Sequence, residues 1–324
     1  MKPLLAACLF AVAALGAPLT AHAQTHPWPA KPVRWVVPYP AGGGSDFLAR
    51  NIGQQLSTQI GQPVIIDNKP GGNTAIAASE VARSAPDGET LLSADNGTLV
   101  YNPALYKSLS YNPGKDLAPV TLMGRFPMIL VVGPGVKAAD VKAFVAEVRA
   151  IPDGINYASA GAGSPHHLAM ELFRTEAGLK MTHAAYRGAA PALADVAGGQ
   201  VPAMMVDLAA GAGFIKGGKV RPLAVANAKR LAQLPDVPTF AEMGIDVEAA
   251  ALVGLVVPSA TPPDVIAAIN KQVVTAINSP EVHRKLVDFG IEPVANSPTQ
   301  FADLLKSETT RWHKLIRDLR ISLD

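Results

Sequence analysis

Three consecutive glycines are the first feature of this sequence whose chemistry suits a ligand. They lie in the stretch PYPAGGGSD, from Pro38 to Asp46, directly after the apolar run at residues 33–37. Glycines at such a place let the backbone come close to a ligand, and the free N–H groups of a helix that starts there favour an anion. Dinucleotide-binding, P-loop and nucleophile-turn patterns all fail here, the first and third because Phe47 replaces a required glycine. An anion-binding loop and a plain glycine turn both remain open.

A second loop with small residues and hydroxyls lies at residues 158–167, ASAGAGSPHH. It again joins a strand-like run to a helix-like run, so two such loops can face each other across a cleft. Neighbouring residues on a helix point in different directions, so His166 and His167 cannot both turn toward one metal ion. We therefore expect hydrogen bonds at a helix start here, and no metal or other cofactor.

A third loop of the same form follows His183 and contains Tyr186-Arg187-Gly188. The Arg187 guanidinium either pairs with a substrate carboxylate in a two-pronged contact or lies on the surface. Asp207 ends another buried-looking run, at a strand's carboxyl end, where α/β sheets place their ligands. It either orients a loop or accepts a bond from a ligand hydroxyl or amine.

Two further polar sites follow the same logic. Asp95-Asn96-Gly97-Thr98 comes after a strand-like run and is either part of the ligand site or an ordinary turn. Asp46 is interpreted as a helix-start residue that accepts backbone N–H bonds, in preference to a ligand contact. Serine, histidine and aspartate all occur, but no serine lies in a nucleophile turn, so nothing in the sequence demands catalysis.

The elements that must position these loops follow an alternating rhythm. Strand-like runs at residues 33–37, 63–67 and 90–94 alternate with helix-like runs, and a second series of the same kind begins near Phe126. This is the pattern of mainly parallel sheets covered by helices, and it predicts two α/β lobes. Two helices are expected near the C-terminus, each opened by a capping hydroxyl, at Thr261 and at Ser297.

Composition and the N-terminal residues limit the class of protein. Lys2 and the apolar run from Leu4 to Leu19, which ends before Ala21-His22-Ala23, predict a cleaved signal peptide at residues 1–23. Cys8 superficially resembles a lipoprotein attachment site, but too short an apolar segment precedes it. Removal of this segment leaves 27 basic and 26 acidic residues, scattered along the chain, so nucleic acid is not an expected partner. We expect a soluble, exported protein.

The sequence resembles the receptors of the tripartite tricarboxylate transporter system, often called Bug receptors. The resemblance covers nearly all of the chain after residue 23 and includes ordered blocks such as WPAKPVRWVVPYPAGGGSD, GQPVIIDNKPGGN, YNPGKDLAPV, INYASAGAGSPHHLAMELF and LPDVPTFAEMG. It implies a type II periplasmic binding protein, or Venus flytrap, with one lobe at residues 24–125 and 249–324 and the other at 126–248. It further implies a monomer that closes on a small carboxylate and delivers it to the transporter's membrane subunits.

The resemblance also implies which residues bind the ligand. Backbone N–H groups and ordered waters of the first two loops would hold the carboxylate. The predicted ligand-binding residues are Tyr39, Ala41, Gly42, Gly43, Gly44, Ser45, Asp95, Thr98, Ser159, Gly161, Gly163, Ser164, Tyr186 and Asp207.

Some positions depart from the family pattern, so the identity of the ligand cannot be transferred. The segment from Lys69 to Thr74 differs, Val206 stands where many members carry aspartate, and Leu252-Val253 stands where a Trp-Phe pair occurs. Two other functions remain as alternatives. One is a sensor that signals ligand occupancy to a membrane protein; the other is a secreted hydrolase using Ser164 and His167.

Overall fold

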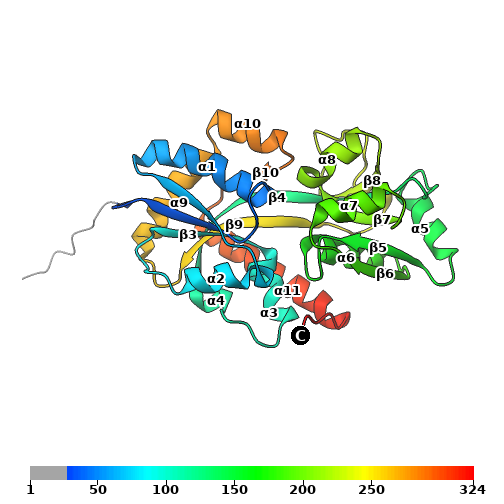
Figure 1. Cartoon of the computed structure of the whole chain (residues 1–324), viewed down its shortest axis with the longest axis horizontal. Coiled ribbons are helices and arrows are strands. Elements are labelled where there is room, and N and C mark those ends of the chain that lie inside the picture. The colour runs from blue at the N-terminus through cyan, green and yellow to red at the C-terminus, as the bar shows by residue number, and fades with distance from the viewer. Residues whose placement is uncertain (1–27) are drawn as a thin grey trace, which may run out of the picture.

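One long strand, β4 (Leu117–Val132), runs through both halves of the molecule (Figure 1). The computed structural model describes residues 28–324. Up to Pro127, β4 pairs with β9 (Ala250–Pro258); from Met128 onward it pairs with β7 (Ala203–Asp207) and β8 (Arg221–Ala226). Two sheets, called A and B below, therefore share β4.

Sheet A has the order β2-β1-β3-β9-β4-β10. Its strands β1 (Val33–Val37), β2 (Val64–Asn68) and β3 (Thr90–Asp95) are parallel, whereas β9 and β10 (Glu292–Pro293) are antiparallel to their neighbours. The helices of this half are α1 (Gly44–Ile60), α2 (Ala75–Ala82), α3 (Asn102–Leu105), α4 (Pro113–Asp116), α9 (Pro263–Ile277), α10 (Pro280–Asp288) and α11 (Pro298–Asp318). Two short helical turns, η1 (Gly72–Thr74) and η2 (Gly97–Tyr101), precede α2 and α3.

Sheet B has the order β6-β5-β7-β4-β8. Strands β5 (Ile155–Ser159) and β6 (Met181–Ala185) run parallel to each other and to β7, and β4 is antiparallel to both of its neighbours. Its helices are α5 (Val141–Arg149), α6 (Pro165–Glu176), α7 (Ala189–Ala197) and α8 (Leu208–Lys216), followed by the turn η3 (Ala241–Met243).

Apolar periodicity explains how the helices are seated on the sheets. In α1, Leu48, Ile52 and Leu56 recur every four residues, so they share one face of the helix, and all three are fully buried. They pack in one apolar cluster with Val33 and Trp35 of β1. Burying this stripe holds the start of α1 at the carboxyl end of β1, where the glycine loop lies.

The expected alternation of strands and helices is confirmed, with three differences. Strand β4 begins nine residues before Phe126, and the sheets are mixed, because β4 and β9 run antiparallel to their partners. The expected cap at Thr261 is wrong: Pro262 is the N-cap of α9, and the Thr261 hydroxyl has no hydrogen-bond partner among the described residues. The second expected cap, at Ser297, is confirmed as a capping box with Gln300.

The predicted signal peptide, residues 1–23, lies outside the described residues. Within residues 28–324, no helix combines the length and hydrophobicity that a membrane span requires.

Candidate functional site

The first glycine loop is held in place by Asp46. The Asp46 carboxylate accepts hydrogen bonds of 2.9 Å from the Gly42 N–H, from Arg50 Nε and from Asn68 Nδ2. Burial opposes ionisation, but these three donors outweigh it and lower the pKa of Asp46. Asp46 thus accepts a backbone N–H, as expected, but the donor Gly42 lies in the loop before the helix, and the expected role of Asp46 as the helix cap is wrong because the N-cap is Gly43. Gly42 has φ +88°, a conformation that glycine adopts without strain.

The start of α1 leaves backbone donors free. Its N-cap is Gly43, which has no side chain to cap the helix. The first backbone N–H of the helix with a partner is that of Phe47, which donates to the Gly43 carbonyl at 2.9 Å. Among the described residues, the N–H groups of Gly44, Ser45 and Asp46 have no acceptor, and Ala41, Gly42 and Gly43 are exposed. This helix start therefore offers several N–H groups and a positive dipole end to an anion.

Tyr39, Asp95 and Thr98 meet in a buried network beneath this loop. The Tyr39 hydroxyl donates a short hydrogen bond to Asp95, and the Thr98 N–H donates to the other oxygen of Asp95 at 2.9 Å. Burial, with the neighbouring Asp95 charge, raises the pKa of Tyr39 well above its ordinary value. Asp95 and Thr98 are almost completely buried, so the residues after β3 form an internal support and not an exposed turn.

The loop before α2 is a feature that the predicted residue set omits. Gly71, Gly72, Asn73 and Thr74 all have positive φ, and Thr74 is a buried, β-branched residue at φ +74°. Such conformations are costly for branched side chains and cluster at binding sites. Hydrogen bonds hold Thr74 to Thr98 at 2.8 Å and to Asn102 at 3.4 Å. The adjacent glycines after a strand-like run were the available sequence signal.

In sheet B, the loop after β5 is tied to the helix that it opens. Ser164 is the N-cap of α6 and accepts the His167 N–H at 3.2 Å, while the Gly163 N–H donates to His167 Nδ1 at 3.1 Å. Gly161 and Gly163 have φ values of +140° and +75°, which favour glycine. The buried Ser159 hydroxyl contacts His183 Nε2 at 2.6 Å.

The loop after β6 lies beside the loop after β5. The Tyr186 N–H donates to the Ser159 carbonyl at 3.1 Å, and the Tyr186 hydroxyl donates to Asp195 at 2.6 Å. The next helix, α7, starts after Gly188 with no side-chain cap, so its first N–H groups are also free. Arg187, which lies between Tyr186 and Gly188, is exposed, and this agrees with the alternative that it lies on the surface.

Asp207 ends β7 and makes two contacts. Its Oδ1 caps α8 by accepting the Ala210 N–H at 3.0 Å, and its Oδ2 lies 2.9 Å from His166 Nε2. Burial opposes ionisation, but the hydrogen bonds from His166 and from the Ala210 N–H lower the pKa of Asp207. Asp207 therefore orients α8 and His166. This is the first of the two roles that the sequence left open for it.

The two groups of loops approach each other at β4 and at Gly163. A Cβ atom built on Gly44 would lie 2.7 Å from the Phe126 ring of β4, and Met128, two residues further on, is the partner of Asp207 in the sheet. A Cβ built on Gly163 would lie 2.8 Å from Leu105 and 3.6 Å from Asn73 Nδ2. The predicted residues thus form one group on each sheet, and Gly163 lies against Leu105 and Asn73 of the opposite half.

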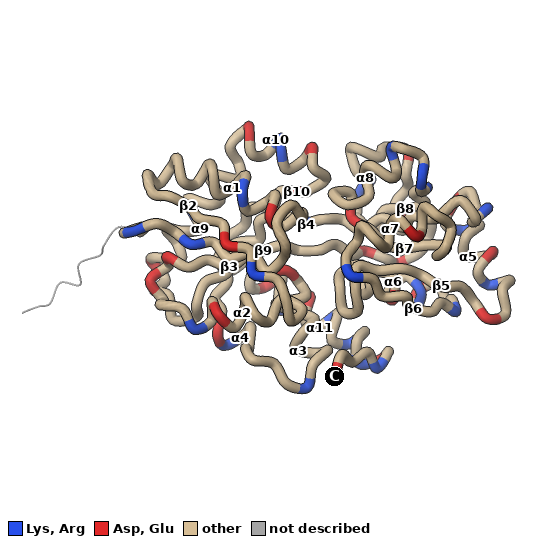
Figure 2. Tube along the Cα trace, in the orientation of Figure 1, with Lys and Arg blue, Asp and Glu red and all other residues tan. Residues whose placement is uncertain are grey.

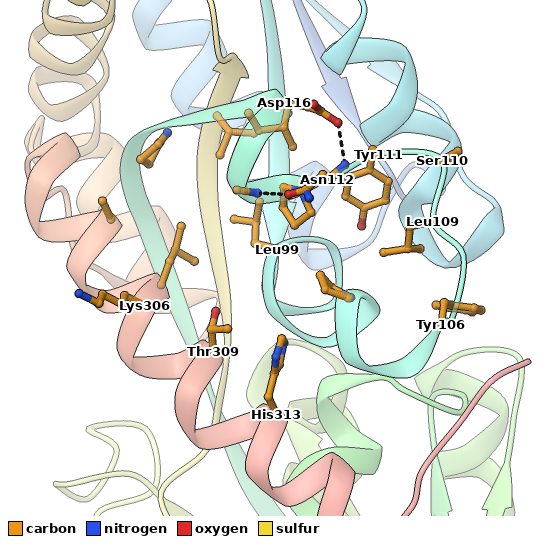
Figure 3. Close-up of a pocket in the computed structure, with 18 of the residues that line it drawn as sticks. Leu99, Tyr106, Leu109, Ser110, Tyr111, Asn112, Asp116, Lys306, Thr309 and His313 are labelled. Carbon is orange, nitrogen blue, oxygen red and sulfur yellow. Dashed lines mark hydrogen bonds between the residues drawn. The ribbon is translucent and has the colours of Figure 1, made fainter.

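A cavity of about 810 Å³ lies elsewhere, between α11 and the chain around α3 and α4 (Figure 3). None of the fourteen predicted residues lines this cavity. Among its lining residues, only Leu99 is adjacent in sequence to a predicted residue, Thr98. Two polar groups on its wall are paired: Asn112 Oδ1 accepts the Gly114 N–H at 3.1 Å, and His313 Nε2 lies 2.7 Å from the Val100 carbonyl. Lys107 and Lys306 also line this cavity, and neither side chain forms an ion pair among the described residues.

Charged residues of both signs are interspersed over the two halves (Figure 2). With a formal net charge of +2 for the full sequence, the general field of the protein is weak. An anion would therefore be held mainly by local dipoles such as the helix starts.

Comparison with known proteins assigns the chain to a family. Residues 48–321 match the model of the tripartite tricarboxylate transporter family receptor. The chain is 33% identical to the protein BugT of Bordetella pertussis over 310 residues, which is 95% of this chain and 94% of BugT.

Solved structures of similar proteins confirm the predicted fold. Rpa4515 of R. palustris, solved with adipate, is 35% identical, has a TM-score of 0.82 and is matched over 90% of this chain and 97% of that one. MatC of Rhodopseudomonas palustris, with bound malate, is 32% identical with a TM-score of 0.79, over 89% and 100% of the two chains. The α/β periplasmic binding protein fold expected from the sequence is thereby confirmed.

Proposed function

This chain belongs to the tripartite tricarboxylate transporter family of receptors, and from that premise we propose that it binds a small organic acid through a carboxylate between its two halves. It is a solute-binding receptor and not an enzyme. The relatives solved with adipate and malate support a carboxylate as the ligand. The partners in transport are the membrane subunits of a tripartite tricarboxylate-type transporter, to which the receptor delivers the acid.

The free start of α1 is the observation that carries the proposal. The N–H groups of Gly44, Ser45 and Asp46 have no acceptor among the described residues, and no side chain occupies the N-cap. A carboxylate placed there would accept charge-assisted hydrogen bonds and interact favourably with the helix dipole. The free start of α7 offers a second set of donors from the opposite half.

We further propose that the halves move as two lobes, residues 24–125 with 249–324 and residues 126–248. Strand β4 changes its pairing partner between Pro127 and Met128, and this supports the division. The pairing of β9 with β4 begins at Ala250, close to the second proposed boundary. Ligand that contacts both lobes would shift the population toward a closed arrangement.

The relatives support a periplasmic location. Similar solved chains are described as periplasmic, one as a periplasmic transporter and one as the periplasmic binding protein BugD. We propose that residues 1–23 direct export as a cleaved signal peptide and that the receptor then acts as a monomer.

A thermal-shift screen against mono-, di- and tricarboxylates, aromatic acids and acidic amino acids tests the ligand class. A ligand at a hundred times its Kd stabilises the native state by about 2.7 kcal/mol, which raises the Tm of a chain of this size by about 5 °C. The site is then tested with Gly43→Val. A valine at this N-cap would block the approach of an anion, and we expect affinity to fall by about tenfold or more, the worth of a charge-assisted hydrogen bond.

Gly135→Val is the matched control. Gly43 has φ −82°, and a Cβ built on it meets only the Pro40 carbonyl at 3.8 Å, so the variant should fold. Gly135 is likewise exposed, and a Cβ there meets nothing within 4 Å, but it lies before α5, away from the loops. Equal affinity of the Gly43 and Gly135 variants would rule out the start of α1 as the carboxylate site.

A further inference from the structure

The pairing of His166 with Asp207 determines which nitrogen of the histidine ring faces the carboxylate. The two side chains are each 12% exposed, and His166 Nε2 lies 2.9 Å from Asp207 Oδ2. The capping bond from Ala210 and the contact with His166 lower the pKa of Asp207, so this carboxylate is ionised and only accepts hydrogen bonds. Nε2 must therefore be the nitrogen that donates, and in a ring that carries one proton this leaves Nδ1 as an acceptor.

His166 Nδ1 is buried and has no hydrogen-bond partner. Among the described residues, only two other buried side-chain atoms share this property, Glu89 Oε2 and Thr261 Oγ1. Glu89 precedes β3 and Thr261 follows β9, so both lie at the opposite edge of sheet A from the loops. Buried polar atoms are nearly always paired in folded proteins, so an unpaired one at a binding edge calls for a donor.

Three donors of the loop after β5 are engaged with other partners. The Gly163 N–H is used by His167 Nδ1, the Ser164 hydroxyl donates to the Gly161 carbonyl at 2.7 Å, and the Ser159 hydroxyl contacts His183. His166 lies at the start of α6, and its partner Asp207 is paired in the sheet with Met128, two residues from the Phe126 ring that packs on Gly44. The unpaired nitrogen thus belongs to the same edge as the free start of α1.

We propose that His166 determines ligand specificity: its Nδ1 accepts a hydrogen bond from a hydroxyl or ammonium group of the bound acid. This inference rests on the proposed function, because it assumes that an acid binds between the lobes. It narrows the ligand to acids that carry such a donor, the hydroxy and amino acids, over plain diacids of the same length. A plain diacid would leave the buried nitrogen without a partner, which costs affinity.

Matched acids test the inference by calorimetry on the purified protein. The probes are succinate, malate and aspartate, and the five-carbon set glutarate, 2-hydroxyglutarate and glutamate, whose members differ only in the donor. We expect the hydroxy or amino member of one set to bind about tenfold more tightly than the plain diacid. The two donor-bearing arms distinguish a hydroxyl from an ammonium ligand.

The variant His166→Gln separates this role from support of Asp207. The glutamine amide reaches the position of Nε2 and can still donate to Asp207, but nothing replaces the Nδ1 acceptor. In this variant the dissociation constant of the plain diacid divided by that of the donor-bearing acid should fall to about 1. The control is His283→Gln, at an exposed position on α10, which should keep the ratio of the native protein.

Four results would overturn the inference. The inference would be wrong if the native protein bound all members of a set with equal affinity, although the protein would still be a carboxylate receptor. It would also be wrong if the preference for the donor-bearing acid persisted in His166→Gln. Failure of every acid to bind would instead overturn the proposed function, and this inference with it. Nitrogen-15 NMR of the ring supplies a readout without ligand: the Nε2–H tautomer is expected, and an Nδ1–H tautomer would contradict the argument.

Discussion

At the scale of residues, the buried His167 and the partly buried His183 support the loop after β5. The rings of His167 and His183 stack with centroids 3.9 Å apart, and Tyr157 stacks on His183 at 5.1 Å. His167 accepts the Gly163 N–H, so its ring must keep Nδ1 unprotonated to hold the loop. Burial, together with the nearby His183, lowers the pKa of His167 to about 4, and burial also lowers the pKa of His183.

This lowered pKa predicts a loss of stability in mild acid. In the unfolded chain the histidine binds a proton near its ordinary pKa of about 6.5, whereas the folded His167 does so only near 4. Between these values the unfolded state binds more protons, so the free energy of unfolding decreases as the pH falls from about 6.5 to about 4. The full effect is about 3 kcal/mol for this residue.

The comparison with His167→Asn isolates this residue from the carboxylates that also titrate in acid. The asparagine oxygen can replace Nδ1 as acceptor for Gly163 but does not titrate. Urea unfolding at several pH values between 7 and 4 should show that the variant loses about 3 kcal/mol less than the native protein. His283→Asn, at an exposed position, serves as the control. Parallel curves for the native protein and His167→Asn would contradict the lowered pKa.

Part of the candidate site could be predicted from single residues. The sequence identified Asp46 as an acceptor of a backbone N–H and the glycine loops as helix starts, because these features depend on neighbouring residues. The positive φ of Thr74 could not be predicted, since bonds to Thr98 and Asn102, far along the chain, maintain it. The role of His167 likewise depends on its stacking with His183.

At the scale of elements, two helix starts that look alike in sequence behave differently. The Ser297 hydroxyl accepts the Gln300 N–H at 3.2 Å, and Gln300 Oε1 accepts the Ser297 N–H at 3.0 Å. Together these bonds form a capping box for α11. Thr261 precedes Pro262 and Pro263, and its buried hydroxyl bonds to nothing among the described residues. Proline at both following positions removes the first N–H groups that a cap would satisfy.

Substitutions at these positions should therefore change stability in opposite directions. Ser297→Ala removes a working cap and should lower the free energy of unfolding by about 1 kcal/mol. Thr261→Val keeps the shape of the side chain but removes an unpaired hydroxyl, so it should be neutral or stabilising by up to about 1 kcal/mol. Denaturant unfolding measures both variants. A loss in Thr261→Val as large as that in Ser297→Ala would mean that Thr261 caps α9 after all.

Strand β4 shows why some elements escaped prediction. Its interior contains Pro119 and Pro127, which usually argue against a strand, and its register with β9 shifts between Pro119 and Thr121 and again between Leu122 and Gly124. These irregularities obscure the alternation on which strand prediction depends. The shorter run of β1, uninterrupted and flanked by loops, was predicted with its observed bounds.

At the scale of the whole molecule, the two proposed lobes touch beyond the shared strands. Asn227 Nδ2 donates to Glu292 Oε1 at 2.8 Å, and Gln233 Nε2 donates to the Val287 carbonyl at 2.6 Å. Nearby, Leu208 at the start of α8 packs so closely on Gly290 that a Cβ there would lie 2.7 Å from it. These contacts connect sheet B to the segment around α10 and β10, and they stabilise the described arrangement of the lobes.

Removing both side-chain bonds should broaden the distribution of lobe arrangements. Each bond contributes about 1 kcal/mol, so Asn227→Ala with Gln233→Ala should shift the equilibrium between arrangements by a factor of about 30. Spin labels on cysteines placed at the exposed positions Gln54 and Gln200 report the distance between lobes, and Cys8 is the only native cysteine in the sequence. We expect a broader distance distribution in the double variant, and narrowing when a carboxylate ligand contacts both lobes.

Arg230→Ala provides the control for this experiment, because its ion pair with Glu242 at 2.9 Å lies within one proposed lobe. It removes a surface contact without altering the connection between lobes, so its distance distribution should match that of the native protein. The same distribution in the double variant would show that β4 and β9 alone fix the arrangement. Ligand-induced closure would then have to bend those two strands near Met128 and Ala249, and substitutions there would control affinity instead.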